Sequence, residues 1–197
     1  MYTDAVRRWP RPGRASRPWP GLHDRALLLV GFGGAFRRSE LVSLDVADLR
    51  FARGSLVLTL RRSKTGQEGV CELKAIPRGE QPESCPARTL EAWLEASAIS
   101  DGPIFRRVTC WGRVGRRRLS DRVVALVVKQ RAEVAGLDPR RYAGHSRRAG
   151  LATAAARVGV EERDIMRQTG HRSERMVRKY IHEGQLFRNN AAGRVGL

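Results

Sequence analysis

Two short stretches of alternating apolar and polar residues most constrain how this 197-residue chain can fold. Residues 55–60 alternate in this way, and residues 70–76 do so again. A period of two is typical of a half-buried β-strand. The polar segment between them, residues 61–69, suits the turn of a hairpin. The sequence therefore predicts an antiparallel sheet of three strands or fewer.

Helical patterning covers much of the remaining chain. Pro86 suits the first position of a helix, and Ser120 and Gly136 suit the N-cap and the stop of another. We expect residues 21–49 to be helical, with a second, short helix over 39–44. Further helices are expected from Pro86 onward and over residues 121–135, 146–158, 161–168 and 173–181. Gly159, Gly170 and Gly184 punctuate the last three, and residues 103–119 are expected to be irregular.

These patterns predict a fold that is mainly α with a small antiparallel β-sheet (α+β). We expect one domain over residues 21–185. Residues 1–20, rich in Pro and Arg, are interpreted as a tail or linker remnant. Residues 186–197 are interpreted as a C-terminal tail.

The charge of the chain restricts its partners. The 38 basic and 20 acidic residues give a formal net charge of +18, which favours an anionic partner. Nucleic acid is the first candidate and an acidic membrane surface the second. The longest apolar run, residues 26–36, is too short to span a bilayer. The chain has three widely spaced cysteines, Cys71, Cys85 and Cys110, which fit reduced thiols in a cytosolic protein. We therefore expect a cytoplasmic location.

Four short motifs combine residue types that can bind or attack a phosphate, although each has a simpler interpretation. Arg37 and Glu40 lie three apart and could form a helix-surface ion pair. A lysine at the hairpin tip, Lys64, could be merely solvated. The remaining two are His145-x-x-Arg148 at a helix start, a pattern that surface helices often contain, and Gly170-His171 nine residues before Tyr180, which could be a half-buried core tyrosine.

The order of these motifs resembles the tyrosine recombinase (phage integrase) family. Residues 36–44 resemble the first arginine box of that family, and residues 145–153 resemble the second. The resemblance covers residues 22–184 and implies the fold of the family's catalytic domain. Members usually carry an N-terminal helical domain that grips the other face of the DNA, and we expect it to be missing here.

The resemblance implies roles for the cationic residues. Arg37 and Arg148 would clamp the non-bridging oxygens of the scissile phosphate, and Lys64 would protonate the departing 5′-oxygen. Glu40 would orient its neighbours. Guanidinium groups suit this task because their planar forks answer the charge that develops during phosphoryl transfer.

The resemblance also implies the nucleophile and its helpers. Tyr180 would attack to form a 3′-phosphotyrosyl link, His145 would handle the tyrosine proton, and His171 would donate a hydrogen bond to the phosphate. A phenol of ordinary pKa near 10 needs such help at neutral pH. Because the covalent link would conserve the bond energy, we expect no metal, no ATP and no small-molecule cofactor.

The expected function is therefore site-specific recombination or integration of double-stranded DNA, by a homo-tetramer in the full-length context and without a membrane partner. Two alternatives stay open, a type IB topoisomerase and a non-catalytic DNA-binding module. Arginines beside the catalytic set are expected to face solvent or the DNA backbone: Arg38, Arg62, Arg147 and Arg172.

Overall fold

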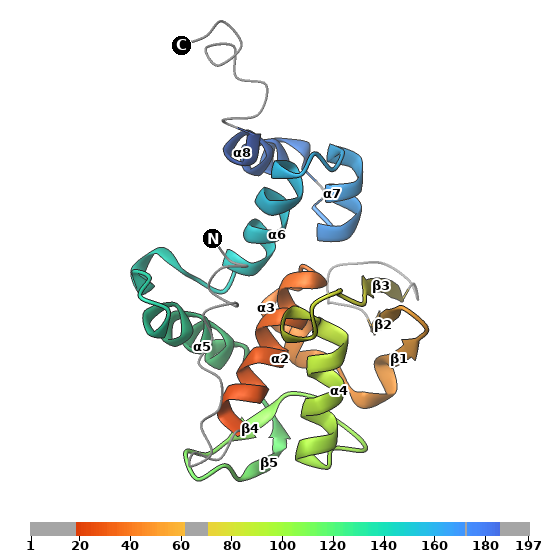
Figure 1. The fold of residues 1–197 in the computed structure, drawn as a ribbon, viewed down its shortest axis with the longest axis vertical. Helices are drawn as coiled ribbons and strands as arrows, with labels where there is room; N and C mark the ends of the chain where they lie inside the picture. Colours follow the sequence, from red (N-terminus) through yellow and green to blue (C-terminus); the bar gives the residue numbers. More distant parts are fainter. Residues whose placement is uncertain (1–18, 62–70, 172, 186–197) are drawn as a thin grey trace, which may run out of the picture.

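A computed structural model describes residues 19–61, 71–171 and 173–185 (Figure 1). The α-helices are α2 (Trp19–Gly33), α3 (Arg38–Ser43), α4 (Pro86–Ser97), α5 (Asp121–Val134), α6 (Ser146–Arg157), α7 (Glu162–Thr169) and α8 (Glu174–Gln185). The strands are β1 (Leu49–Ala52), β2 (Ser55–Leu60), β3 (Glu72–Pro77), β4 (Arg106–Val108) and β5 (Val114–Arg118). Three short 3-10 helices are η1 (Val46–Asp48), η2 (Pro82–Ser84) and η3 (Pro139–Arg141). The prediction of a mainly helical fold with small antiparallel sheets is confirmed.

The predicted hairpin strands are the centre and one edge of a three-stranded antiparallel sheet, in the order β1-β2-β3. Leu58 of β2 lies opposite Leu49 of β1 and Lys74 of β3. Leu56, Leu58 and the opposing Ile76 are buried, so this face of the sheet packs against the helices. Strand β1 begins at Leu49, the last residue of the segment that the sequence suggested to be helical.

A second sheet corrects the expectation that residues 103–119 are irregular. Strands β4 and β5 pair antiparallel, with Val108 opposite Val114. Gly112, at a φ of +76°, lies in the tight turn between them. The arginines of β5 are exposed, so its sequence lacks the clear alternation that marks a half-buried strand.

Residues 21–49 contain two helices, α2 and α3, as the sequence predicted, and the break between them places a candidate site residue. Helix α2 ends at Gly33, and Ala35 adopts a positive φ of +50°. A Cβ atom on Gly34 would lie 2.1 Å from the Phe36 ring, so the tight turn needs glycine at this position. The turn ends α2 and leaves Arg37 at the N-cap of α3.

The apolar side chains form two clusters. The main core includes residues of α2, α4, α5 and the three-stranded sheet, with Leu27, Phe36 and Trp93 fully buried. The C-terminal cluster consists of Ala152, Ala156, Ile165 and Val177. Helices α6, α7 and α8, cyan to blue in Figure 1, pack together above the body that contains the main core. Within the described segments, no helix has both the length and the apolar character to cross a membrane.

Gly184 lies inside α8 and brings it close to α6, whereas the sequence suggested that this glycine separates elements. A Cβ atom at position 184 would lie 2.6 Å from the carbonyl oxygen of Thr153 and 2.9 Å from the Cβ of Ala156. These atoms belong to backbone and to a short side chain, so they cannot easily move aside. The missing side chain therefore sets the spacing of the two helices.

We predict that Gly184→Ala destabilises the protein by about 1–3 kcal/mol, the usual cost of overpacking, although Ala is the better helix former. Thermal unfolding measures this loss. Lys179→Ala, on an exposed position of the same helix, is the control and should change little. A Gly184→Ala protein as stable as the parent would contradict the close packing.

Candidate active site

Arg37 is fixed by Glu40, its partner in the first motif. The backbone N–H of Arg37 donates a 2.7 Å hydrogen bond to Glu40 Oε2, and its Nη1 forms an ion pair with Oε1. The ion pair offered as the simpler interpretation is therefore present. It leaves the Arg37 side chain 52% exposed, so the guanidinium group keeps donors for a further ligand.

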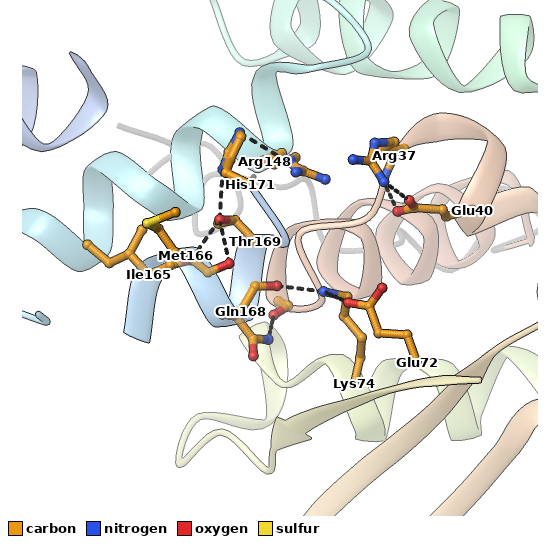
Figure 2. Close-up of polar contacts among 11 residues, drawn as sticks. Arg37, Glu40, Glu72, Lys74, Arg148, Ile165, Met166, Gln168, Thr169 and His171 are labelled. Carbon is orange, nitrogen blue, oxygen red and sulfur yellow. Dashed lines mark hydrogen bonds and ion pairs between the residues drawn. The ribbon is translucent and has the colours of Figure 1, made fainter. Parts of the chain in front are cut away.

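Arg148 and His171 meet directly, although they come from different helices (Figure 2). Arg148 lies in the first turn of α6, and its Nε donates a 3.2 Å hydrogen bond to His171 Nε2. His171 follows Gly170, which ends α7 with a φ of +63°. Its Nδ1 lies 2.7 Å from the hydroxyl of Thr169. The glycine turn thus directs the imidazole toward Arg148.

Tyr180 approaches the same place from α8. Its ring centroid lies 5.9 Å from that of His171, and the two rings are tilted by 42°. The half-buried ring packs against the C-terminal cluster, so the phenol is held by α6, α7 and α8 together. Tyr180, His171 and Arg148 therefore lie next to one another, with His171 in the middle.

Positive charge is concentrated in this site. Burial, and then the nearby Arg37, lower the pKa of the Arg148 guanidinium, which is only 8% exposed. Within the described ranges, no carboxylate lies at ion-pair distance from Arg148. Figure 2 shows its guanidinium group pointing toward that of Arg37. Two guanidinium groups this close repel each other unless an anion binds with them.

The same surroundings keep His171 neutral. Burial, followed by the charges of Arg148, Arg37 and Lys74, lowers the pKa of His171 to about 4. The imidazole is therefore uncharged near neutral pH, and it can accept the hydrogen bond of Arg148.

Lys74 is a buried cation of this site that the sequence analysis missed. Its Nζ forms a 2.8 Å ion pair with Glu72 and donates a 2.8 Å hydrogen bond to the carbonyl oxygen of Gln168. Gln168 in turn donates to the carbonyl oxygen of Gly33 at the end of α2. These contacts hold the end of α7, just before His171, against β3 and α2. The alternation of side chains along a strand could have revealed it, because Lys74 lies two residues before Ile76 and therefore on the same inward face of β3.

His145 is not brought into contact with the other candidates. It is the N-cap residue of α6, and its exposed ring forms no hydrogen bond or ion pair with the described residues. Arg148, three residues later, faces His171 instead. The proposed proton transfer to His145 therefore stays a prediction.

The predicted position of Arg147 is wrong. Its side chain is fully buried rather than exposed to solvent, and a Cβ atom on Gly31 of α2 would lie 2.8 Å from its Nε. The reason is that α6 packs against α2, and Arg147 lies on the side of α6 that meets Gly31. Arg38 is half-buried, with its stem over Gly144 and its Nη2 3.8 Å from Asp121. Lys64, Arg62 and Arg172 lie outside the described residues.

Comparisons with known proteins show the family of the chain. The model of the Phage integrase family matches residues 17–185. An integrase/recombinase xerD homolog from Selenomonas ruminantium is 46% identical over 175 residues, covering 89% of this chain and 51% of the relative. A tyrosine recombinase XerD from Xanthomonas axonopodis pv. citri (strain 306) is 31% identical over 159 residues, covering 78% of this chain and 48% of the relative. The chain thus spans about half the length of these curated relatives.

Solved structures show the same fold. The XerH site-specific recombinase bound to difH substrate, in a pre-cleavage complex, matches with a TM-score of 0.66 at 15% identity. The match covers 92% of this chain and 47% of that one. Because the family model matches most of the chain and the two relatives are named as an integrase/recombinase and a tyrosine recombinase, this protein belongs to the phage integrase family of tyrosine recombinases.

Proposed function

We propose that this chain is the catalytic domain of a site-specific DNA recombinase that cuts and rejoins double-stranded DNA through a 3′-phosphotyrosyl intermediate. The observation that carries the proposal is Arg148, a nearly buried guanidinium group with no carboxylate partner among the described residues, beside Arg37 and Tyr180. A phosphodiester would supply the missing anion.

In this reaction Arg37 and Arg148 hold the two non-bridging oxygens of the phosphate. The hydroxyl oxygen of Tyr180 attacks phosphorus, the new O–P bond forms, and the bond to the 5′-oxygen breaks. The tyrosine proton passes to His145, and Lys64 gives a proton to the departing 5′-oxygen. Attack by a 5′-hydroxyl of the partner strand reverses these steps and rejoins the DNA.

The proposed chemistry needs neither a metal ion nor ATP. Fixed cationic donors can stabilise the developing charge, and the phosphotyrosyl link keeps the energy of the broken bond. We further propose that Arg38, Arg62 and Arg172 contact the DNA backbone, and that the full-length protein acts as a homo-tetramer. The fully buried Arg147 is left out of this set.

A covalent-capture experiment tests the proposal. The protein is mixed in EDTA, without nucleotide, with an excess of labelled nicked duplexes whose sequence is randomised around the nick. Low salt is used so that weak phosphate contacts do not limit binding. We expect a protein–DNA band that survives denaturing electrophoresis, and mass spectrometry should place the nucleotide on Tyr180. No adduct with any duplex, or an adduct that requires metal, would contradict the proposal.

A further inference from the structure

The hydrogen bond between Arg148 and His171 can have only one donor, which is Arg148. The Nε of an arginine always carries a hydrogen and cannot accept. At 3.2 Å, it must therefore donate to His171 Nε2, which presents a lone pair. A neutral imidazole has one proton, so that proton sits on Nδ1.

Thr169 completes this assignment from the other side of the ring. Its hydroxyl donates a 2.7 Å hydrogen bond to the carbonyl oxygen of Ile165. The hydroxyl hydrogen is thus occupied, and an oxygen lone pair remains for the Nδ1–H of His171 at 2.7 Å. Since Thr169 is 1% exposed, water does not readily replace these contacts. A directed chain runs from Arg148 through His171 and Thr169 to the backbone of α7.

This chain limits what His171 can do in the free protein. The nitrogen that faces Arg148 carries no proton, so it cannot donate to a phosphate held by the arginines. A second proton, placed on Nε2, would make this nitrogen a donor and end its contact with Arg148. The Nε–H of Arg148 would then be free for the same phosphate.

The charges around the ring decide when this second proton binds. Three positive groups oppose the second proton, and they come from three different parts of the fold: Arg37, Lys74 and Arg148. Two carboxylates, Glu40 and Glu72, act on Arg148, and the phenol of Tyr180 lies beside the His171 ring. Together with burial, the positive groups lower the pKa of His171 to about 4 in the free protein. An anion among them offsets their charge and should raise this pKa.

Building on the function proposed above, we propose that Thr169 is a positioning residue that keeps the single proton of His171 on Nδ1. His171 then donates to the phosphate only after taking up a second proton from solvent on Nε2 and releasing Arg148. Phosphate binding and proton uptake are therefore linked at this histidine.

The ring tautomer can be measured without DNA. Long-range ¹⁵N–¹H NMR distinguishes a protonated ring nitrogen from one with a lone pair, and His171→Gln identifies the signals among the four histidines. We expect Nδ1–H and a bare Nε2 in the parent protein and in Thr169→Ser. Thr169→Val, similar in shape but without the hydroxyl, should lose the fixed tautomer. A protonated Nε2 in the neutral ring of the parent would overturn the inference.

A pH titration tests the link to an anion, with inorganic sulfate as the probe because it stays a dianion throughout. Sulfate should raise the pKa of His171 above its free value of about 4. Sulfate affinity should accordingly increase as the pH falls from the bound-state pKa toward the free-state value, and level off below it. Sulfate that binds the arginines and leaves this pKa unchanged would refute the proton uptake.

The rate of adduct formation tests the consequence for catalysis. Thr169→Val should slow single-turnover adduct formation roughly tenfold to a hundredfold, with unchanged DNA affinity, because the doubly protonated ring of His171 loses the acceptor that orients its Nδ1–H. Thr169→Ser should restore most of the rate. Equal rates and equal tautomers in the parent and Thr169→Val would overturn the role of Thr169. No adduct in the parent protein would instead overturn the proposed function, and the NMR assignment would stand.

Discussion

Tyr180→Phe is expected to abolish the covalent protein–DNA adduct and to leave folding and DNA affinity nearly unchanged. The substitution removes only the hydroxyl, which is the proposed nucleophile. That hydroxyl makes no hydrogen bond with the described residues, while the ring packs on the C-terminal cluster and remains in the variant. The free energy of unfolding should therefore change by less than about 1 kcal/mol. Denaturing gels, DNA-binding titrations and thermal unfolding measure the three quantities.

Tyr142→Phe is the matched control. Tyr142 is also half-buried, but it packs against the main core, whereas Tyr180 packs against the C-terminal cluster. Its variant should form the adduct at the parental rate. If Tyr180→Phe still formed an adduct while Tyr142→Phe did not, the nucleophile would be misassigned.

Elements with strong local signals were predicted well. Helix α4 begins at Pro86, α5 begins after Ser120, and Gly136 follows its end with a φ of +74°. In each case a residue next to the helix end fixes the backbone there, so the sequence contains the boundary. The two alternating stretches likewise became β2 and β3 because one face of each strand is buried.

Features that depend on how side chains pack were not predictable in this way. The apolar run of α2 continues past Gly33, and it is the packing of Phe36 that requires the turn at Gly34. Gly184 looked like a helix end, yet it lies where α8 crosses α6. The glycine at position 34 makes room for the ring of Phe36, and the one at position 184 makes room for α6, but the sequence does not say which contact a glycine permits.

The candidate site shows the same division. Motif spacing selected Arg148 over Arg147, and the structure places Arg148 on His171. Spacing could not reveal that Arg147 is buried against α2, because this depends on the packing of α6. Lys74 was missed because a lysine in a strand normally faces solvent, whereas here a backbone carbonyl and Glu72 satisfy its charge.

Arg148→Met should have opposite effects on activity and stability. Arg148 supplies two prongs to the phosphate in the proposed reaction, and loss of one preorganised donor typically costs about 10²- to 10³-fold in rate. We therefore expect at least this loss in adduct formation. Arg148→Lys should restore little, since a lysine keeps the charge but loses the planar fork and the Nε–H that contacts His171.

The stability of Arg148→Met should equal or exceed that of the parent protein in the absence of DNA. The guanidinium group is nearly buried, its pKa is lowered by burial and by Arg37, and no carboxylate of the described residues lies at ion-pair distance. The folded protein thus holds this charge at a cost, and a Met of similar length removes it. Such a trade of stability for function is common at active sites.

Arg131→Met provides the matched control, because Arg131 is a largely buried arginine that has a carboxylate partner. Its Nε and Nη2 donate 2.8 Å and 2.6 Å hydrogen bonds to Asp24 of α2. This variant should lose on the order of 2 kcal/mol of stability, the usual contribution of a hydrogen bond to a charged group, while adduct formation by the folded fraction is unchanged. Thermal unfolding and single-turnover kinetics on both variants make the comparison. If Arg148→Met were destabilised as much as Arg131→Met, Arg148 would be a structural residue. Its lack of a carboxylate partner would then no longer support the proposed function.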